Sequence, residues 1–181
     1  MLQPLPAPPT EKPPNLSEIF RANGPFVYRA LRRLGVREAD MDDACQEVFI
    51  VVHRRYGDFE GRSSLRTWLY GIAVRVASAF RRRAHNKRET MESSPDAEDA
   101  ANAESDYQKR QLLQMLDEAL STLDDDKRAA FVLYEVEELT MAEVAEALGC
   151  PLQTAYSRLT VARERVQKVL LRKMESGGDD A

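Results

Sequence analysis

The chain has 181 residues, enough for one domain or two small ones, and 43% of them are hydrophobic. Its formal net charge of -4 excludes a protein that is basic throughout, as a general nucleic-acid coat would be. The sequence contains no apolar run long enough to span a bilayer and no signal-peptide core. Cys45 and Cys150 make no disulfide framework. We therefore expect a cytoplasmic protein without membrane insertion.

Proline and charge divide the chain into segments. Residues 1–14 hold six of the nine prolines, which predicts a disordered Pro-rich arm over 1–15. Residues 17–88 carry fifteen basic and eight acidic side chains, a net charge of +7, whereas residues 89–106 carry seven acidic side chains and no basic one. This asymmetry favours a polyanion-binding module followed by a flexible acidic linker. We expect the last residues, 175–181, to form a disordered tail.

The first predicted helix runs from Ser17 to Leu34 and ends at Gly35. Gly24 and Pro25 should kink or restart it. Its apolar residues recur at helical spacing and form an inner face made of Phe20, Val27, Ala30, Leu31 and Leu34.

The second predicted helix spans Asp40 to Tyr56, with a buried stripe made of Met41, Ala44, Cys45, Val48 and Val52. The opposite face carries Asp43, Gln46 and Ile50, with Glu47 beside them. An isoleucine flanked by an acid and an amide makes a mixed patch that suits a protein partner. A single surface isoleucine needs no special explanation, however, so these residues alone favour an ordinary solvated face.

A polar loop over 59–64 precedes the third predicted helix, Leu65 to about Arg83, whose core face is Leu65, Trp68, Ile72, Val76 and Phe80. Thr67 and Tyr70 are expected on its outer side, among the arginines Arg62, Arg66, Arg75, Arg81, Arg82 and Arg83. Arginines beside aromatic and hydroxyl groups at a flexible loop are typical of a platform for single-stranded nucleic acid. The alternative is a purely structural role, in which Trp68 is a core residue and the terminal arginines complement the helix dipole.

Helical spacing returns after the linker. One helix is predicted to contain Leu112, Leu113, Met115, Leu116 and Leu120, and the next one Ala129, Phe131, Val132, Leu133 and Val136. Thr140 then caps a short helix, Glu143 completes a capping box, and Gly149 ends the helix.

The last predicted helix starts at Pro151, and its inner face is Ala155, Leu159, Ala162, Val166 and Leu170. Its outer face is polar and flanked by arginines. A short helix, a turn with glycine and a longer helix of this kind indicate a DNA-binding helix-turn-helix. The alternative for this stretch is an ordinary αα-hairpin.

Three blocks in series carry a family resemblance: DDACQEVFIVVHRRY, then FEGRSSLRTWLYGIAVRVA, and, after the acidic linker, LTMAEVAEALGCPLQTAYSRLTVARERV. In this order and spacing the chain resembles the extracytoplasmic-function sigma factors of the sigma-70 family. The resemblance implies an all-α fold with two small helical domains. Residues 16–88 would be sigma region 2, residues 107–174 would be the helix-turn-helix region 4, and residues 89–106 would join them.

The resemblance also implies three sets of site residues. The set that docks on the clamp helices of the largest RNA polymerase subunit is Asp43, Gln46, Glu47 and Ile50. The set that captures a base of the -10 element and faces the melted strand is Phe59, Glu60, Gly61, Arg62, Ser63, Ser64, Arg66, Thr67 and Arg75. The set that reads the -35 element is Gln153, Thr154, Tyr156, Ser157, Arg158, Thr160 and Arg163. Further implied partners are the flap of the second-largest polymerase subunit, promoter DNA and an anti-sigma factor that no residue identifies.

The chain departs from the family pattern at four positions. Family recognition helices usually carry Lys or Arg where this chain has Tyr156 and Val161, so direct guanine readout is not expected there, and Arg158 or Arg163 should contribute through phosphates. In the melting helix, Gly71 stands where an Arg is usual and Arg75 where an Asn is usual. Contacts with the -10 element should therefore be rearranged.

Two other functions compete with this interpretation. A stand-alone helix-turn-helix regulator would bind an operator without polymerase. An enzyme would need a metal gathered by acids such as Asp40, Asp42, Asp43 and Glu47, of which only Asp43 and Glu47 form an i, i+4 pair. The sequence shows no Ser/His/Asp set, Walker loop or zinc-ligand spacing. We expect no catalytic residue, no metal site and no cofactor.

Overall fold

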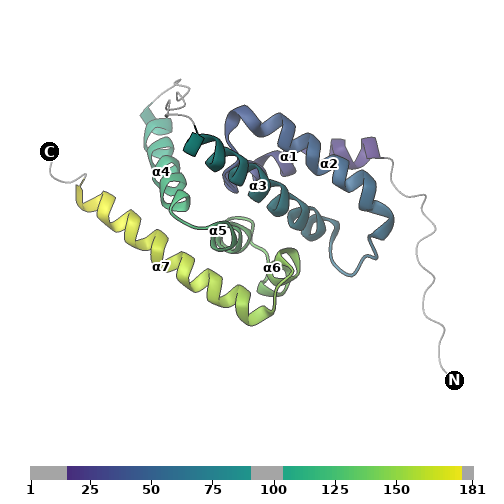
Figure 1. Cartoon of the computed structure of the whole chain (residues 1–181). Helices are drawn as coiled ribbons and strands as arrows, with labels where there is room; N and C mark the ends of the chain where they lie inside the picture. Colours follow the sequence, from purple (N-terminus) through teal and green to yellow (C-terminus); the bar gives the residue numbers. More distant parts are fainter. Residues whose placement is uncertain (1–15, 91–103, 177–181) are drawn as a thin grey trace.

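The computed structural model describes residues 16–90 and 104–176, and these residues form helices and turns without any strand (Figure 1). The predicted Pro-rich arm, most of the acidic linker and the end of the tail lie outside the described residues. Residues 16–90 are called the first lobe below, and residues 104–176 the second lobe. The all-α prediction is confirmed.

The first lobe contains three helices, α1 (Leu16–Arg33), α2 (Met41–Arg55) and α3 (Leu65–Thr90), which pack against one another. Its core is apolar and includes the fully buried side chains of Val27, Leu31, Met41, Val48, Val52 and Leu69. The buried stripe predicted for α2 is confirmed apart from Cys45, which is only partly buried. A glycine is required at Gly35, where the chain leaves α1 with φ of 88°.

The predictions that Phe20 faces the core and that α1 restarts at Gly24 and Pro25 are wrong. Phe20 was expected on the inner face, yet it is 52% exposed and contacts the edge of the Phe49 ring, with 4.7 Å between ring centroids. Its neighbour Ile19 is buried instead. The helix continues without interruption through Gly24 and Pro25, and the one-residue difference in helical phase places Ile19 rather than Phe20 against the core.

The second lobe contains α4 (Glu104–Ser121), α5 (Asp125–Phe131), α6 (Met141–Leu148) and α7 (Leu152–Ser176). The long helix α7 packs on α4, α5 and α6. Figure 1 shows α5 and α6 lying between α7 and the first lobe. Helix α3 is longer than predicted, since it extends to Thr90 instead of about Arg83. Helix α4 begins at Glu104, inside the predicted linker.

A π-helical turn over Val132–Val136 continues α5 and leads into Glu137. Its wide hydrogen bond runs from the amide of Glu137 to the carbonyl of Val132, at 3.0 Å. Glu138 follows with φ of 57°, in the left-handed region, and turns the chain toward α6. The turn therefore fixes the direction in which Glu137 leaves the helix.

The helix-turn-helix forms as predicted. The Thr140 hydroxyl accepts a hydrogen bond from the amide of Glu143, and the Glu143 carboxylate accepts one from the amide of Thr140 at 2.9 Å. Gly149 ends α6 with φ of 63°. The inner face of α7 is buried at Ala155, Leu159, Ala162 and Val166.

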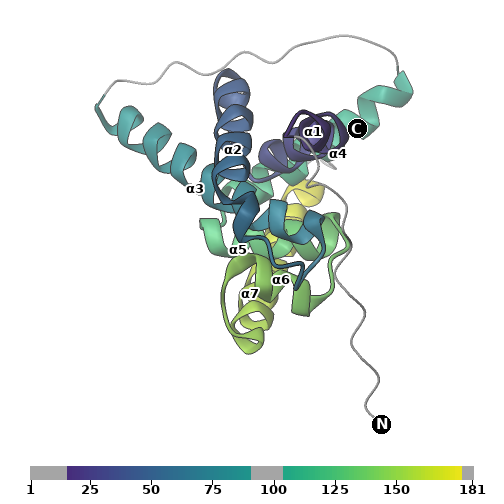
Figure 2. The same ribbon diagram turned by 90° about the vertical axis from the view of Figure 1, so that its right-hand side faces the viewer.

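The two lobes are packed together, with α3 of the first lobe lying against α6 of the second. The view in Figure 2 shows α1 to α3 on one side of this contact and α5 to α7 on the other. One continuous cluster of buried apolar residues extends through both lobes. The interface between the lobes is therefore part of the core.

Candidate nucleic-acid interface

The structure brings the four predicted polymerase-binding residues onto one face of α2. Asp43, Gln46 and Glu47 are exposed and Ile50 is partly exposed. Gln46 and Ile50 also line an open groove between α1 and α2, whose wall includes Phe20 and Phe49. This side of α2 thus combines acidic, amide and apolar groups next to an aromatic-lined groove.

The loop of the predicted -10 set rests on three aromatic rings. The Phe59 ring lies 5.2 Å from that of Trp68 and 6.3 Å from that of Tyr56, measured between centroids. The loop ends where the Ser64 side chain caps α3, accepting a hydrogen bond from the amide of Thr67 at 3.0 Å. Between these anchors, residues 60–62 are exposed. The loop is held at both ends and presents its centre to solvent.

Thr67 and Tyr70 were predicted on the outer face of α3, and this prediction is wrong. Thr67 is 2% exposed and Tyr70 is fully buried. The second lobe covers both residues. The Thr67 hydroxyl donates a hydrogen bond to Glu143 at 3.4 Å, and the Tyr70 hydroxyl donates one to Glu137. Burial, reinforced by the bond to Glu137, raises the pKa of Tyr70 above the usual range for tyrosine.

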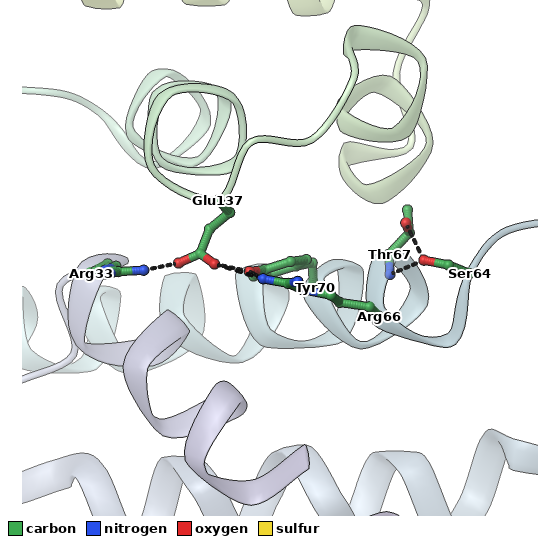
Figure 3. A network of polar contacts seen from close by, with 6 residues as sticks. All are labelled: Arg33, Ser64, Arg66, Thr67, Tyr70 and Glu137. Atoms are coloured by element: carbon green, nitrogen blue, oxygen red, sulfur yellow. Dashed lines mark hydrogen bonds and ion pairs between the residues drawn. The ribbon is translucent and has the colours of Figure 1, made fainter. Parts of the chain in front are cut away.

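The Glu137 carboxylate lies at the centre of a polar network between the lobes (Figure 3). Its side chain is only 6% exposed. One oxygen forms an ion pair with Arg33 from the end of α1. The other accepts from Tyr70 and lies 3.5 Å from the Arg66 guanidinium. Arg66 also contacts the Phe26 ring, with 4.9 Å from its guanidinium carbon to the ring centroid. Two cations and a hydroxyl of the first lobe therefore surround one acid of the second.

Gly71 and Arg75, two of the departures from the family pattern, also lie at this interface. A Cβ atom on Gly71 would lie 3.0 Å from the carbonyl oxygen of Ala147 in α6. Arg75 donates to the carbonyl of Gly71 at 2.8 Å and reaches toward Gly149. The missing side chain lets the two helices approach closely, and the exposed arginine lies beside the contact.

Arg128 of α5 makes a second contact between the lobes. It is 6% exposed, lies against Gly35 and donates to the carbonyl of Arg33 at 3.1 Å. Burial lowers the pKa of Arg128 to about 10, and the positive charge of Arg81 acts in the same direction. Asp125 beside it accepts from Ser78 at 2.5 Å and pairs with Arg81 at 2.9 Å.

The outer face of α7 remains open. The exposed residues there include Gln153, Ser157 and Thr160, together with Leu152, Tyr156 and Val161, which are 49%, 47% and 39% exposed. The two arginines predicted to contact phosphates are turned toward acids of their own lobe. Arg158 pairs with Asp126, and Arg163 pairs with Glu135.

Sequence reasoning missed the roles of Arg33, Arg128 and Glu137. Each lies near a helix end and makes its main contact with a residue far away in the chain, so no local spacing marks it. Within the described residues, no group of three or more potential ligands could hold a metal ion. None of the helices described over 16–90 and 104–176 combines the length and apolar character needed to cross a membrane.

Comparisons with known proteins match both lobes. The Sigma-70 region 2 family covers residues 19–87, and the Sigma-70, region 4 family covers residues 113–166. The ECF RNA polymerase sigma-E factor of Escherichia coli (strain K12) is 32% identical over 141 residues, which is 72% of this chain and 74% of that protein. The protein of the same name from Haemophilus influenzae is 31% identical over 142 residues, covering 73% and 75%.

Two solved structures share the fold. The sigma factor RpoE in complex with the anti-sigma factor NepR from Bartonella quintana has a TM-score of 0.65 at 23% identity, covering 85% of this chain and 95% of that chain. CnrH in complex with the cytosolic domain of CnrY has a TM-score of 0.62 at 21% identity, covering 86% of each chain. The curated relatives are matched over most of their length, and both sigma-70 regions occur in order. This chain therefore belongs to the extracytoplasmic-function sigma factors of the sigma-70 family.

Proposed function

We propose that this chain binds core RNA polymerase in the cytoplasm and directs it to specific promoters, as a transcription initiation factor and not as an enzyme. The observation that carries the proposal is the presence, in one chain, of a region 2 lobe and a region 4 helix-turn-helix. The first lobe would hold the melted -10 strand and the second would read the -35 duplex. A stand-alone regulator would not need the first lobe.

The polymerase contact is assigned to the face of α2 that carries Asp43, Gln46, Glu47 and Ile50. Their exposure supports the assignment, since an interface residue must be reachable. The carboxylates of Asp43 and Glu47 make the patch negatively charged, which suits a basic partner surface. Ile50 and the adjacent groove supply apolar area. The clamp helices of the largest subunit are the proposed partner, with the flap of the second-largest subunit binding the other lobe.

Strand capture is assigned to the loop over 59–64 and to the α3 residues Arg66, Thr67 and Arg75. Thr67 is covered by the second lobe and would be reached after the lobes separate. A stacked or pocketed base contributes about 1–3 kcal/mol, whereas each opened base-pair step costs about 1.4 kcal/mol. One small lobe can therefore trap one or two extruded bases but cannot melt a promoter by itself. The polymerase has to supply the remaining contacts.

Duplex reading is assigned to the exposed side of α7, with Gln153, Thr154, Tyr156, Ser157 and Thr160 toward base edges and Arg158 and Arg163 toward phosphates. A good base contact in the major groove discriminates by about 1–3 kcal/mol. The two arginines pair with acids at the lobe surface, and such exposed ion pairs are weak enough to be exchanged for phosphates.

An anti-sigma protein is the remaining proposed partner. The support is the fold shared with a sigma factor that was solved in complex with the anti-sigma factor NepR.

Transcription in vitro tests the function directly. Core RNA polymerase with this chain should give promoter-dependent transcripts, and neither component should do so alone. Changing Asp43 and Gln46 to alanine should abolish the transcripts and co-purification with core while leaving helicity unchanged. Glu138→Gln, which removes the charge of an exposed acid in the second lobe, is the control. Transcripts that persist in the double variant would contradict the assigned polymerase contact. Binding to an operator without polymerase would favour the stand-alone regulator.

A further inference from the structure

The contact around Glu137 has the composition of an anion receptor. The first lobe supplies two guanidinium groups and one hydroxyl, from Arg33, Arg66 and Tyr70, and all three point at one carboxylate (Figure 3). Charged donors of this kind bind carboxylate and phosphate oxygens alike, because both present oxygens with a negative charge. These three residues are called the cradle below.

A buried carboxylate is a costly way to join two lobes that share an apolar core. Burying a charge is favourable only when several donors replace the lost water, and an apolar side chain would pack here without that cost. The cradle provides enough donors to hold the carboxylate of Glu137, whose side chain is 6% exposed. Since the donors belong to the first lobe, the cradle would remain after the second lobe departs, with its positive charge then open to solvent.

The cradle lies on the surface that the proposed function requires for nucleic acid. Arg66 and Tyr70 are on α3, one turn apart and next to the capped loop over 59–64. The surrounding segment is basic, with a net charge of +7 over residues 17–88. A strand held by that loop would pass close to the cradle with its phosphates, which carry the same charge as the group now bound there.

We propose that Arg33, Arg66 and Tyr70 form a binding site for a backbone phosphate of the promoter strand, and that Glu137 occupies this site when the lobes are docked. The inference rests on the proposed function and deepens it. Docking of the second lobe and binding of the strand are then mutually exclusive. The chain covers its own strand-binding surface until the lobes separate.

The other contacts between the lobes fit this exclusion. Thr67, also assigned to the strand, is covered by Glu143, a second acid of the second lobe. Gly71 lets α6 come close enough to cover α3. Arg75, which occupies a family strand-binding position, is directed along α3 and toward Gly149. Several residues that face DNA in the proposed function are therefore engaged by the second lobe.

Two variants of the full chain test whether Glu137 blocks the site. Glu137→Gln removes the charge at nearly constant shape, and Glu138→Gln makes the same change at the neighbouring exposed residue. Small-angle X-ray scattering should show a larger radius of gyration for Glu137→Gln only. Fluorescence anisotropy with a short, fluorescein-labelled oligodeoxythymidine should show binding about tenfold tighter for Glu137→Gln, the fold-change of one hydrogen bond to a charged group. Equal affinities in the two variants would overturn the proposal.

Salt dependence tests whether the cradle binds phosphate. In the Glu137→Gln background, Arg33→Gln should reduce the slope of log K against log salt by about 0.7, the value for one phosphate contact on a single strand. Arg33→Lys should retain the slope. Tyr70→Phe should weaken binding without changing the slope, because the hydroxyl carries no charge. An unchanged slope in Arg33→Gln, with helicity intact by circular dichroism, would exclude a phosphate contact.

These measurements are separable from the proposed function. If the oligonucleotide results appear as expected and core polymerase with this chain gives no promoter transcripts, the phosphate site stands and the proposed function fails. If transcripts appear while Glu137→Gln and Arg33→Gln behave like their controls, the function stands and the inference fails.

Discussion

The backbone of Gly71 in α3 lies directly against the carbonyl of Ala147 in α6, so that a methyl group on residue 71 would come within 3.0 Å of that oxygen. This distance is too short for an ordinary contact between a carbon and an oxygen atom. The first and second lobes therefore meet at a point where only glycine fits without a shift of one helix. The contact explains a residue that departs from the family pattern of the melting helix.

Gly71→Leu should separate the lobes. Leucine is too large for the space below Ala147, but it favours the helical conformation more than glycine does, so α3 itself should not be weakened. Small-angle X-ray scattering of the full chain should show a larger radius of gyration. Gly57→Leu is the matched control, because a Cβ atom at Gly57 would have no neighbour within 4 Å. A radius of gyration that is unchanged in Gly71→Leu would show that the contact does not hold the lobes together.

Tyr70→Phe should make stability less sensitive to alkaline pH. The folded state raises the pKa of Tyr70, so the tyrosine stabilises the fold below its ordinary pKa of about 10 and loses this contribution as the pH rises further. Urea midpoints measured from about pH 9 to about pH 11 should fall more steeply for the natural chain than for Tyr70→Phe. Tyr156→Phe, at an exposed position, should follow the natural chain. If the urea midpoint fell equally with pH in the natural chain, Tyr70→Phe and Tyr156→Phe, the burial and hydrogen bond assigned to Tyr70 would be contradicted.

Thr140→Ala should lower the free energy of unfolding by about 1 kcal/mol, the usual cost of losing an N-cap. The Thr140 hydroxyl accepts the amide of Glu143, and this amide would lose its partner. Urea unfolding at neutral pH measures the change. Thr140→Ser keeps a hydroxyl and should recover most of the loss. If alanine and serine were equally stable, the capping box would contribute nothing to the second lobe.

Gln153→Ala and Arg158→Ala should affect promoter recognition in different ways. Gln153 is exposed on the outer face of α7, and its loss should relax discrimination at one -35 position by about 1–3 kcal/mol. Loss of Arg158 should weaken all promoters alike and reduce the salt slope by about 0.9 for one duplex phosphate. Holoenzyme binding to a set of single-base -35 variants at several salt concentrations distinguishes the two patterns. The opposite pattern would reverse the assigned roles.

Local signals in the sequence predicted most of the helices within each lobe. Thr140, Glu143 and Gly149 marked the ends of α6 because caps depend on residues within one turn. The buried face of α7 was predicted from the helical spacing of its apolar residues. Ala155, Leu159 and Val166 recur on one side of the helix, and this side packs against the core. The prediction for Phe20 was wrong because an error of one residue in helical phase rotates a side chain by about 100° around the helix axis.

The interface between the lobes was not predictable in the same way. Tyr70 has an amphipathic side chain, and its spacing on α3 allowed either solvent or a second lobe above it. Arg33 and Glu137 are 104 positions apart in the chain, and a single sequence contains no signal that links two charges at that separation. Gly71 was visible as a departure from the family pattern, but only the structure shows that α6 lies against it.

The π-helical turn over Val132–Val136 holds one more residue than an α-helical turn would. Deleting one residue there would restore the regular spiral and rotate Glu137 by about 100° around the helix axis. Its carboxylate would then point away from Arg33, although Glu137 and the three cradle residues would all still be present in the chain. A single-codon deletion in this turn should therefore remove the Glu137 contact and leave the cradle without its carboxylate.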